Sequence, residues 1–239
     1  MLSAYTSLLR GVMERASKAA RLYYKVVEPV MGYPRHREYL AQLAVGVDCW
    51  LVARMLGELH DSIAGERVCI IFPGHESPGD CRILGAPESA VLYSLESGKR
   101  LDYITGDLDA SLRLVGHYTT AARFRLIHLH GDNIERVKSL STSIAPFIPT
   151  TQVDPTGCVV NLGGFTDGDR AIMVAMVMGA SEVIVKPLPG RIRGEHKDYK
   201  GAWSKALKLE LGLRLVDEAA RLLGYRVYVD GEARIYTVK

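Results

Sequence analysis

The sequence predicts an α/β protein with three layers, α/β/α, in which a mainly parallel sheet lies between helices and further helices precede it. Two observations lead to this prediction. Apolar residues recur at helical spacing through residues 1–65, and short apolar runs replace that spacing after residue 66. These short runs then alternate with amphipathic segments, as strands alternate with helices in parallel sheets. We therefore expect an N-terminal helical region over residues 1–65 and an α/β catalytic domain over residues 66–239.

The N-terminal region is expected to contain two long helices. Residues 2–28 form the first, which we expect Pro29, Gly32 and Pro34 to end. The second is expected from about His36 to Ile63, with Gly65 ending it. The apolar residues of its expected buried face are Leu40, Leu43, Ala44, Val47, Leu51, Met55 and Leu59.

The expected strands are short apolar runs, as in the buried strands of a parallel sheet. They cover residues 68–72, 90–93, 101–104, 126–129, 158–161 and 182–185. Helices are expected over 169–178 and 202–223. The last two apolar runs, 225–229 and 233–236, are expected to form a hairpin across Asp230 and Gly231.

Composition narrows the class of protein. Hydrophobic residues make up 48% of the 239 residues, enough for a core without a metal or disulfide to hold it. The net charge of +3 is too small to indicate a nucleic-acid partner. The longest apolar run, 171–180, is shorter than the ~20 residues of a membrane span. The N-terminal residues include several charges and do not resemble a signal peptide, so we expect a cytoplasmic protein without a membrane partner.

The four cysteines show no metal-binding spacing. Cys69 and Cys158 lie in apolar runs and are expected to be buried thiols of a protein from a reducing compartment. The alternative to free thiols is a disulfide of the kind found in thermophiles. The four cysteines are Cys49, Cys69, Cys81 and Cys158.

Aspartates follow three of the expected strands where those strands end. In parallel sheets ligands bind beyond the carboxyl ends of the strands, so these side chains are expected to converge. Converging carboxylates repel one another unless a cation lies between them, and oxygen ligands suit Mg²⁺. The residues are Asp107 and Asp109 after 101–104, Asp132 after 126–129, and Asp167 and Asp169 after 158–161.

Each of these segments on its own also fits a simpler interpretation. An aspartate before a helix is usually an N-cap, which suits Asp167 or Asp169, and Gly-Asp pairs are common in turns. His128 and His130 lie two apart on one strand and share a face. They are either a packed pair or residues that bind substrate or orient the carboxylates.

The same segments resemble those of a known family, the archaeal 6-hydroxymethyl-7,8-dihydropterin pyrophosphokinases, and more distantly thiamine pyrophosphokinases. The resemblance covers roughly residues 66–223, and its longest motif is Asn161-Leu162-Gly163-Gly164-Phe165-Thr166-Asp167-Gly168-Asp169-Arg170-Ala171. The other matching segments are 105–109, 128–133 and 150–152. The resemblance implies the layered fold of a thiamine pyrophosphokinase catalytic domain. It also implies transfer of diphosphate from ATP to the pterin alcohol, releasing AMP, for coenzymes of the tetrahydromethanopterin or folate type.

On this hypothesis Asp107, Asp109, Asp167 and Asp169 bind Mg²⁺, and one of them or Asp132 accepts the hydroxyl proton. The hydrogen-bonding edge of the pterin is assigned to the group His128, His130, Asn133, Gln152, Asp154 and Asn161. The triphosphate of ATP is assigned to Arg170, to the backbone at Gly163 and Gly164, and to a basic stretch whose other interpretation is a solvated loop. That stretch contains Lys186, Arg191, Arg193, Lys197, Lys200, Lys205 and Lys208.

The sequence departs from the family at 73–77, 94–98 and 186–194, which leaves other functions open. One alternative is a related diphosphokinase or sugar-nucleotide transferase with another substrate. The other is a non-catalytic nucleotide- or pterin-binding paralogue. A homodimer is expected only because dimers are common.

Overall fold

A computed structural model describes residues 2–72, 81–109, 117, 121–140, 146–186, 199–231 and 233–238. Within them eight strands form one sheet in the order β5-β4-β3-β2-β1-β6-β8-β7. Six neighbouring strands, β5 to β6 in that order, are parallel, while β8 pairs antiparallel with β6 and with β7. The expected mainly parallel sheet is therefore confirmed. In chain order the strands are β1 (Arg67–Ile71), β2 (Ile83–Pro87), β3 (Leu101–Gly106), β4 (Ala122–His128), β5 (Ile148–Thr150), β6 (Glu182–Lys186), β7 (Tyr225–Asp230) and β8 (Ala233–Val238).

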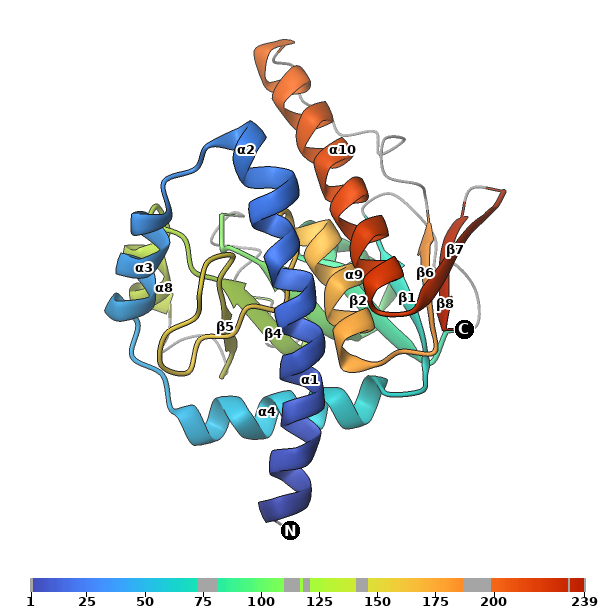
Figure 1. Ribbon diagram of the computed structural model, residues 1–239, viewed down its shortest axis with the longest axis horizontal. Helices are drawn as coiled ribbons and strands as arrows, with labels where there is room; N and C mark the ends of the chain where they lie inside the picture. Colours follow the sequence, from blue (N-terminus) through green and yellow to red (C-terminus); the bar gives the residue numbers. More distant parts are fainter. Residues whose placement is uncertain are drawn as a thin grey trace.

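Helices α1, α4, α9 and α10 lie over one face of the sheet (Figure 1). The central strand β1 shows why its run is apolar throughout: Val68 and Ile70 belong to the core beneath these helices, while Cys69 and Ile71 belong to a second core on the other face. The second core includes residues of α3, α5 and α8. The helices are α1 (Leu2–Leu22), α2 (Glu28–Met31), α3 (Arg35–Ala44), α4 (Cys49–Ile63), α5 (Val91–Ser97), α8 (Ile134–Leu140), α9 (Asp167–Met178) and α10 (Tyr199–Leu222).

Helix α9 is the innermost helix. Every residue from Asp169 to Met178 is buried, because the helix packs against the sheet on one side and against α1, α4 and α10 on the other. The α1 and α4 helices thus share one core with the sheet. The division of the chain into two regions at residue 65 stays a prediction.

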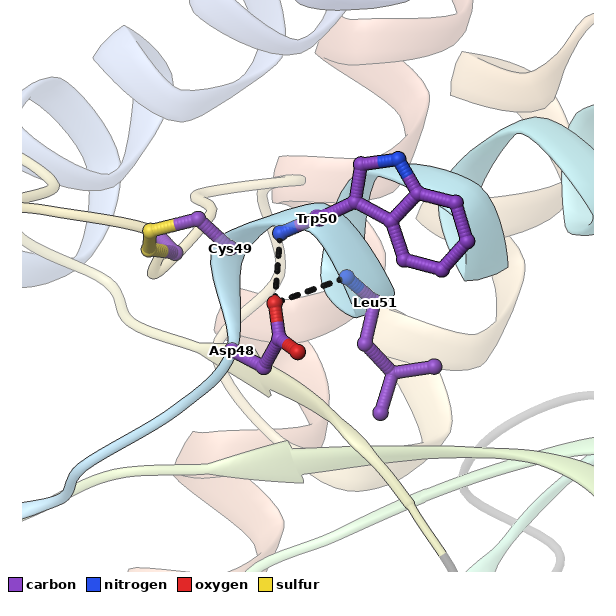
Figure 2. The surroundings of a disulfide bond; sticks show 5 residues. Asp48, Cys49, Trp50 and Leu51 are labelled. Carbon is purple, nitrogen blue, oxygen red and sulfur yellow. Dashed lines mark hydrogen bonds between the residues drawn. A yellow bond between two sulfur atoms is a disulfide. The ribbon is translucent and has the colours of Figure 1, made fainter.

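The single helix expected from 36 to 63 is wrong. The structure divides it into α3 and α4, which are bent by 110°. Asp48 is the N-cap of α4 and accepts hydrogen bonds from the backbone N–H groups of Trp50 and Leu51 (Figure 2). Because the bend changes which face of α3 is buried, Leu40 and Leu43 are 57% and 77% exposed rather than in the core.

The first helix also ends later than expected. A π-helical turn over Tyr23–Val27 leads directly into α2, and Pro29 lies in the first turn of α2. The helix ends at Gly32, whose φ of 60° is left-handed.

Two expected strands are wrong as well. Residues 90–93 are helical, at the junction of a 3-10 turn (Glu88–Ala90) and α5. Residues 158–161 contribute only an isolated bridge between Thr150 and Val160. The strands that occupy these parts of the sheet are β2 and β5. Strand β2 contains Gly85, where an added Cβ would lie 2.2 Å from the ring of Tyr103. Packing therefore requires glycine at this position, although glycine disfavours a strand.

The prediction of free thiols is also wrong, because all four cysteines form disulfides. Cys49, at the start of α4, pairs with Cys158, and Cys69 in β1 pairs with Cys81; their Cα–Cα distances are 5.1 and 5.7 Å. The disulfide of Cys49 lies at the N-terminus of α4 (Figure 2), and its partner Cys158 is thereby held beside that helix end.

No single helix among the described residues has both the length and the apolar composition of a membrane span; α3 and α4 meet that test only as a bent pair.

Candidate active site

A cavity of about 430 Å³ opens where β3 and β4 end. It lies beyond the carboxyl ends of parallel strands, the position at which such sheets bind ligands. Tyr33, Pro34, Arg37 and Glu38 close one side of it, so the N-terminal helices contribute to the cavity together with the sheet. The expected site residues that line it are Asp107, Asp109, His128, His130, Asp132, Gln152, Asp167 and Arg170.

The turn after β3 has a strained backbone. Leu108 is fully buried and has a φ of 64°, a left-handed conformation that is rare for a residue with a side chain. Its backbone N–H donates to Oε2 of Glu88 at 2.9 Å, and the N–H of Asp109 donates to Oδ1 of Asp107 at 3.1 Å. At Gly106 a Cβ would lie 2.1 Å from the same Glu88 oxygen. The glycine therefore admits the Glu88 side chain, which helps to fix the turn.

This turn produces the strongest candidate metal site among the described residues. Glu88, Asp107 and Asp109 each offer a carboxylate oxygen, and these oxygens lie within 4.8 Å of one another. Three hard oxygen ligands suit Mg²⁺ and leave further positions for phosphate oxygens. Glu88 was missed from the sequence. It directly follows β2, so the rule that places ligands at strand ends would have found it had β2 been recognised.

Asn133 and His130 hold the ends of β3 and β4 together. The side-chain amide of Asn133 donates to the carbonyl oxygens of Asp107 and His128, both at 2.7 Å, and its oxygen accepts from the N–H of His130 at 3.0 Å. Nε2 of His130 lies 3.1 Å from Oδ2 of Asp107. Asn133 therefore has its polar atoms engaged with the backbone, whereas the ring of His130 orients a candidate metal ligand.

The carboxylates of the cavity differ in acidity. Burial acts to raise the pKa of Asp107, but the hydrogen bond and charge of His130, together with the N–H of Asp109 and the charge of Arg170, lower that pKa. Burial raises the pKa of Asp167 well above its ordinary value, and the negative charges of Asp107, Glu88 and Asp109 act in the same direction against Arg170. The mutual repulsion of these carboxylates is the condition that a bound divalent cation relieves.

Arg170 is the cationic side chain of the cavity with the least access to solvent. It is 1% exposed, and its Nη1 contacts Oδ1 of Asp167 at 3.3 Å. Its Nε and Nη2 have no hydrogen-bond partner among the described residues. Gly164, with a φ of 94°, lies against it, since a Cβ there would be 2.6 Å from Cα of Arg170. A buried guanidinium with free donors is suited to an anionic ligand such as a phosphate.

Asp169 is held away from the cavity. Its carboxylate accepts from the backbone N–H of Thr166, at 2.9 and 3.0 Å, and from the Thr166 hydroxyl at 2.8 Å, which completes a capping box at the start of α9. It also lies against Gly212 of α10, where a Cβ would be 2.3 Å from Oδ2. The N-cap of α9 is therefore Thr166, and Asp169 is the third helical residue of its capping box; a metal-binding role for Asp169 stays a prediction.

Glu38 of α3 is a second residue missed from the sequence. Its Oε2 accepts from the Thr151 hydroxyl at 2.7 Å and from the backbone N–H of Gln152 at 2.8 Å. Nε2 of Gln152 donates to the carbonyl of Phe165 at 2.8 Å. Nε2 of His128 lies 4.0 Å from Oε1 of Glu38, and burial lowers the pKa of this histidine well below its ordinary value. No sequence pattern links a residue within α3 to the strand ends.

Two further expected residues support the loop before α9. Asn161 donates to the carbonyl of Val153 at 2.9 Å and accepts from the N–H of Gly163 at 3.0 Å. Gly163 has a φ of 81° and packs against α1 and α9, because a Cβ there would be 3.2 Å from Ala19 and from Met173. Both contribute to the backbone conformation of the loop, and neither lines the cavity.

The expected basic stretch falls mostly outside the described residues, as do residues 73–77. Arg191, Arg193 and Lys197 belong to that part, and Lys186 is described only as the last residue of β6. From the same stretch, Lys208 of α10 lines the cavity, with Nζ 5.8 Å from the centre of the Tyr33 ring.

The fold is a mainly parallel α/β sheet whose strand ends carry three carboxylates that could hold a metal ion, beside a cavity that a buried arginine also lines. No family model matches the chain. It is similar to three archaeal proteins, each named 6-hydroxymethyl-7,8-dihydropterin pyrophosphokinase. The relative from Methanothermobacter thermautotrophicus is 31% identical over 138 residues, 54% of this chain and 60% of its own length. The resemblance inferred from the motifs is thereby confirmed.

The other two relatives match shorter stretches. The Pyrococcus furiosus protein is 33% identical over 120 residues, which are 50% of this chain and 48% of that one. The Methanocaldococcus jannaschii protein is 32% identical over 89 residues, which are 35% and 37% of the two chains. The chain thus spans about half the length of the curated relatives it matches.

Proposed function

We propose that the chain transfers diphosphate from ATP to 6-hydroxymethyl-7,8-dihydropterin in a Mg²⁺-dependent reaction that releases AMP. The observation that carries the proposal is one cavity in which Asp107 and Asp109, beside Glu88, lie together with the buried Arg170. The names of the three similar proteins supply the substrates. The product would enter the synthesis of coenzymes of the tetrahydromethanopterin or folate type.

Glu88, Asp107 and Asp109 are the residues that would hold Mg²⁺, with Asp167 beside them. Their oxygens lie within 4.8 Å of one another, close enough for one ion to contact all three, so the donor set fits a hard cation. When bound, Mg²⁺ would supply positive charge that offsets the charge of the phosphates.

The rest of the reaction depends on positioning and charge, as phosphoryl-type transfers do. Arg170 would bind a phosphate oxygen through Nε and Nη2, which have no partner among the described residues. The pterin hydroxyl oxygen forms a bond to the β-phosphorus, and the bond from that phosphorus to the oxygen bridging to the α-phosphate breaks, so AMP leaves. Asp132 and Asp167 line the cavity and are the carboxylates proposed to accept the hydroxyl proton.

The test is AMP formation from ATP and Mg²⁺ with the dihydropterin, compared with thiamine as acceptor. We expect AMP only with the dihydropterin. Asp107→Asn should lower kcat/KM by roughly 100-fold or more, because it removes a ligand charge at the reacting phosphates. Asp61→Asn is the matched control, since Asp61 is an exposed residue of α4 outside the cavity.

AMP formation with thiamine but not with the pterin would replace this proposal by a related diphosphokinase. ATP binding without AMP formation from either acceptor would favour a non-catalytic binding protein. Unchanged turnover in Asp107→Asn would overturn the metal assignment.

A further inference from the structure

We infer that Glu38 recognises the amino edge of the pterin ring and that Tyr33 packs against the face of that ring. Tyr33 lies between α2 and α3, and Glu38 lies in the first turn of α3, so this segment would determine which alcohol the enzyme accepts. The inference rests on the proposed function and extends it to substrate recognition.

The two oxygens of Glu38 have different surroundings. Oε2 already accepts from Thr151 and Gln152. Oε1 has no hydrogen-bond donor among the described residues. The ionisable group beside it is the ring of His128, whose Nε2 lies 4.0 Å away. Because burial lowers the pKa of His128, that histidine is neutral near pH 7 and does not neutralise the carboxylate. Glu38 is 9% exposed and lines the cavity, so its free acceptor is available to a ligand there.

The chemistry of the ring fits this acceptor. A dihydropterin presents its 2-amino group and the adjacent ring N–H as neighbouring donors, whereas its diphosphate-accepting CH₂OH group lies at the other end of the ring system. A carboxylate oxygen accepts from such donors in a charge-assisted hydrogen bond. The carboxylates at the end of β3 line the same cavity as Glu38, which can therefore hold the ring and the reacting phosphates in one space.

Two aromatic side chains form part of the same wall. The rings of Tyr33 and Phe165 have centres 6.1 Å apart and planes tilted by 40°. Phe165 is 7% exposed, whereas Tyr33 is 41% exposed and shares its ring only with Phe165 and with Nζ of Lys208, 5.8 Å from the ring centre, among the described residues. A planar heterocycle gains stacking energy on such a surface.

A purely structural role for Glu38 explains the two hydrogen bonds that Oε2 accepts. It does not explain why Oε1 is left without a donor. The segment that Oε2 binds is also held by Gln42, one turn further along α3. Gln42 donates to the Thr151 hydroxyl at 3.2 Å and accepts from the N–H of Thr156 at 2.7 Å. A structural tie therefore remains when the charge of Glu38 is removed.

Glu38→Gln tests the inference because a glutamine oxygen still accepts from Thr151 and Gln152, while its NH₂ group replaces the free acceptor. The substrates are the dihydropterin and its analogue with oxygen in place of the 2-amino group. We expect the KM for the dihydropterin to rise about 10- to 100-fold, the loss of one charge-assisted hydrogen bond. The preference for the dihydropterin over the 2-oxo analogue should fall, since NH₂ donates to that oxygen. The KM for ATP should stay unchanged.

Glu58→Gln is the control, because Glu58 is a glutamate of α4 paired with Arg54 outside the cavity. Tyr33→Ala should raise the KM for the dihydropterin about 10-fold by loss of stacking, whereas Tyr228→Ala, at a 45% exposed tyrosine of β7, should not change it.

An active wild-type enzyme whose Glu38→Gln variant keeps both the KM and the preference would overturn the inference and leave the proposed function standing. If the wild type releases no AMP, the proposed function fails, and equilibrium titration with the dihydropterin decides on Glu38 separately. Equal affinity of wild type and Glu38→Gln in that titration would then overturn the inference.

Discussion

The backbone N–H of Leu108 donates a 2.9 Å hydrogen bond to Oε2 of Glu88. Leu108 follows β3 and Glu88 follows the neighbouring strand β2. The carboxylate thus stabilises the left-handed conformation of Leu108 and also belongs to the candidate metal group with Asp107 and Asp109. The Glu88 side chain thus contributes both to the backbone conformation of the turn and to the candidate metal group.

Glu88→Gln should separate these two functions. The glutamine oxygen still accepts from Leu108, so the free energy of unfolding should change by less than about 1 kcal/mol. Loss of the ligand charge should raise the Mg²⁺ concentration for half-maximal activity at least about 10-fold. Activity measured against Mg²⁺ concentration checks this, with the exposed Glu96→Gln as control. A Glu88→Gln protein with the wild-type Mg²⁺ requirement would remove Glu88 from the metal group.

Gly164→Ala should destabilise the protein more than Gly157→Ala. Both glycines have positive φ, 94° and 59°, so each alanine incurs a backbone penalty of about 1–2 kcal/mol. A Cβ at Gly157 meets nothing within 4 Å, whereas one at Gly164 would be 2.6 Å from Cα of Arg170. Overpacking at Gly164 adds about 1–3 kcal/mol and displaces Arg170. Denaturant unfolding measures the difference, and equal losses for the two variants would show that the contact with Arg170 is unimportant.

His128 should make the fold sensitive to mild acid. Burial, with the positive charge of Arg170 beside it, lowers the pKa of this histidine well below its ordinary value near 6.5. Below that value the unfolded chain binds a proton that the folded protein does not. The stability from neutral His128 is therefore complete above about pH 6.5 and declines as pH falls, by up to about 1.4 kcal/mol per pH unit.

The difference between wild type and His128→Gln isolates this effect, because the carboxylates contribute equally to both proteins. The wild type should lose stability relative to the variant as pH falls from 7 to 5, as measured by urea unfolding. His36→Gln, at an exposed histidine of α3, is the control for replacing a histidine by glutamine. Parallel curves for wild type and His128→Gln would contradict the prediction.

The two disulfides should stabilise the fold unequally. Cys49–Cys158 joins residues 109 apart in sequence and Cys69–Cys81 joins residues 12 apart. A cross-link that closes a longer loop removes more entropy from the unfolded chain, about 4.7 kcal/mol for the longer loop and about 3 kcal/mol for the shorter. Paired cysteine-to-alanine variants should follow that order in guanidinium unfolding. A reducing agent should lower the stability of wild type but not of the variant that lacks both. The opposite order of the two single losses would contradict the loop argument.

The sequence predicted the position of the cavity, at the carboxyl ends of the strands, better than it predicted which residues line it. Asp107, Asp132 and Asp167 follow β3, β4 and the loop that crosses beside β5, and all three line the cavity. They lie near one another because the carboxyl ends of parallel strands share one edge of the sheet, and their role as site residues stays a prediction. Glu88 was not predicted because β2, the strand before it, was not predicted. Gly85 and Pro87 make the sequence of β2 unlike a strand, but packing against Tyr103 requires the glycine.

Asp169 and Glu38 show two other reasons why the sequence did not predict every residue of the cavity. Asp167 begins α9, and a residue two positions later on a helix points roughly 200° away, so one carboxylate lines the cavity while the other turns back to cap the helix. Glu38 reaches the cavity because the chain bends by 110° between α3 and α4. The continuous helical spacing of the sequence concealed that bend, although Gly46 and Asp48 mark the break.

The bonds from Glu38 and Gln42 to residues 151–156 have a mechanical consequence. These two side chains lie one turn apart on α3, and Cys49–Cys158 adds a covalent link just beyond that helix. Helix α3 is therefore tied to residues 151–158 by side-chain hydrogen bonds along its length and by a covalent link just beyond its end. A displacement of α3 relative to this segment would have to break those hydrogen bonds, and the disulfide would limit its extent.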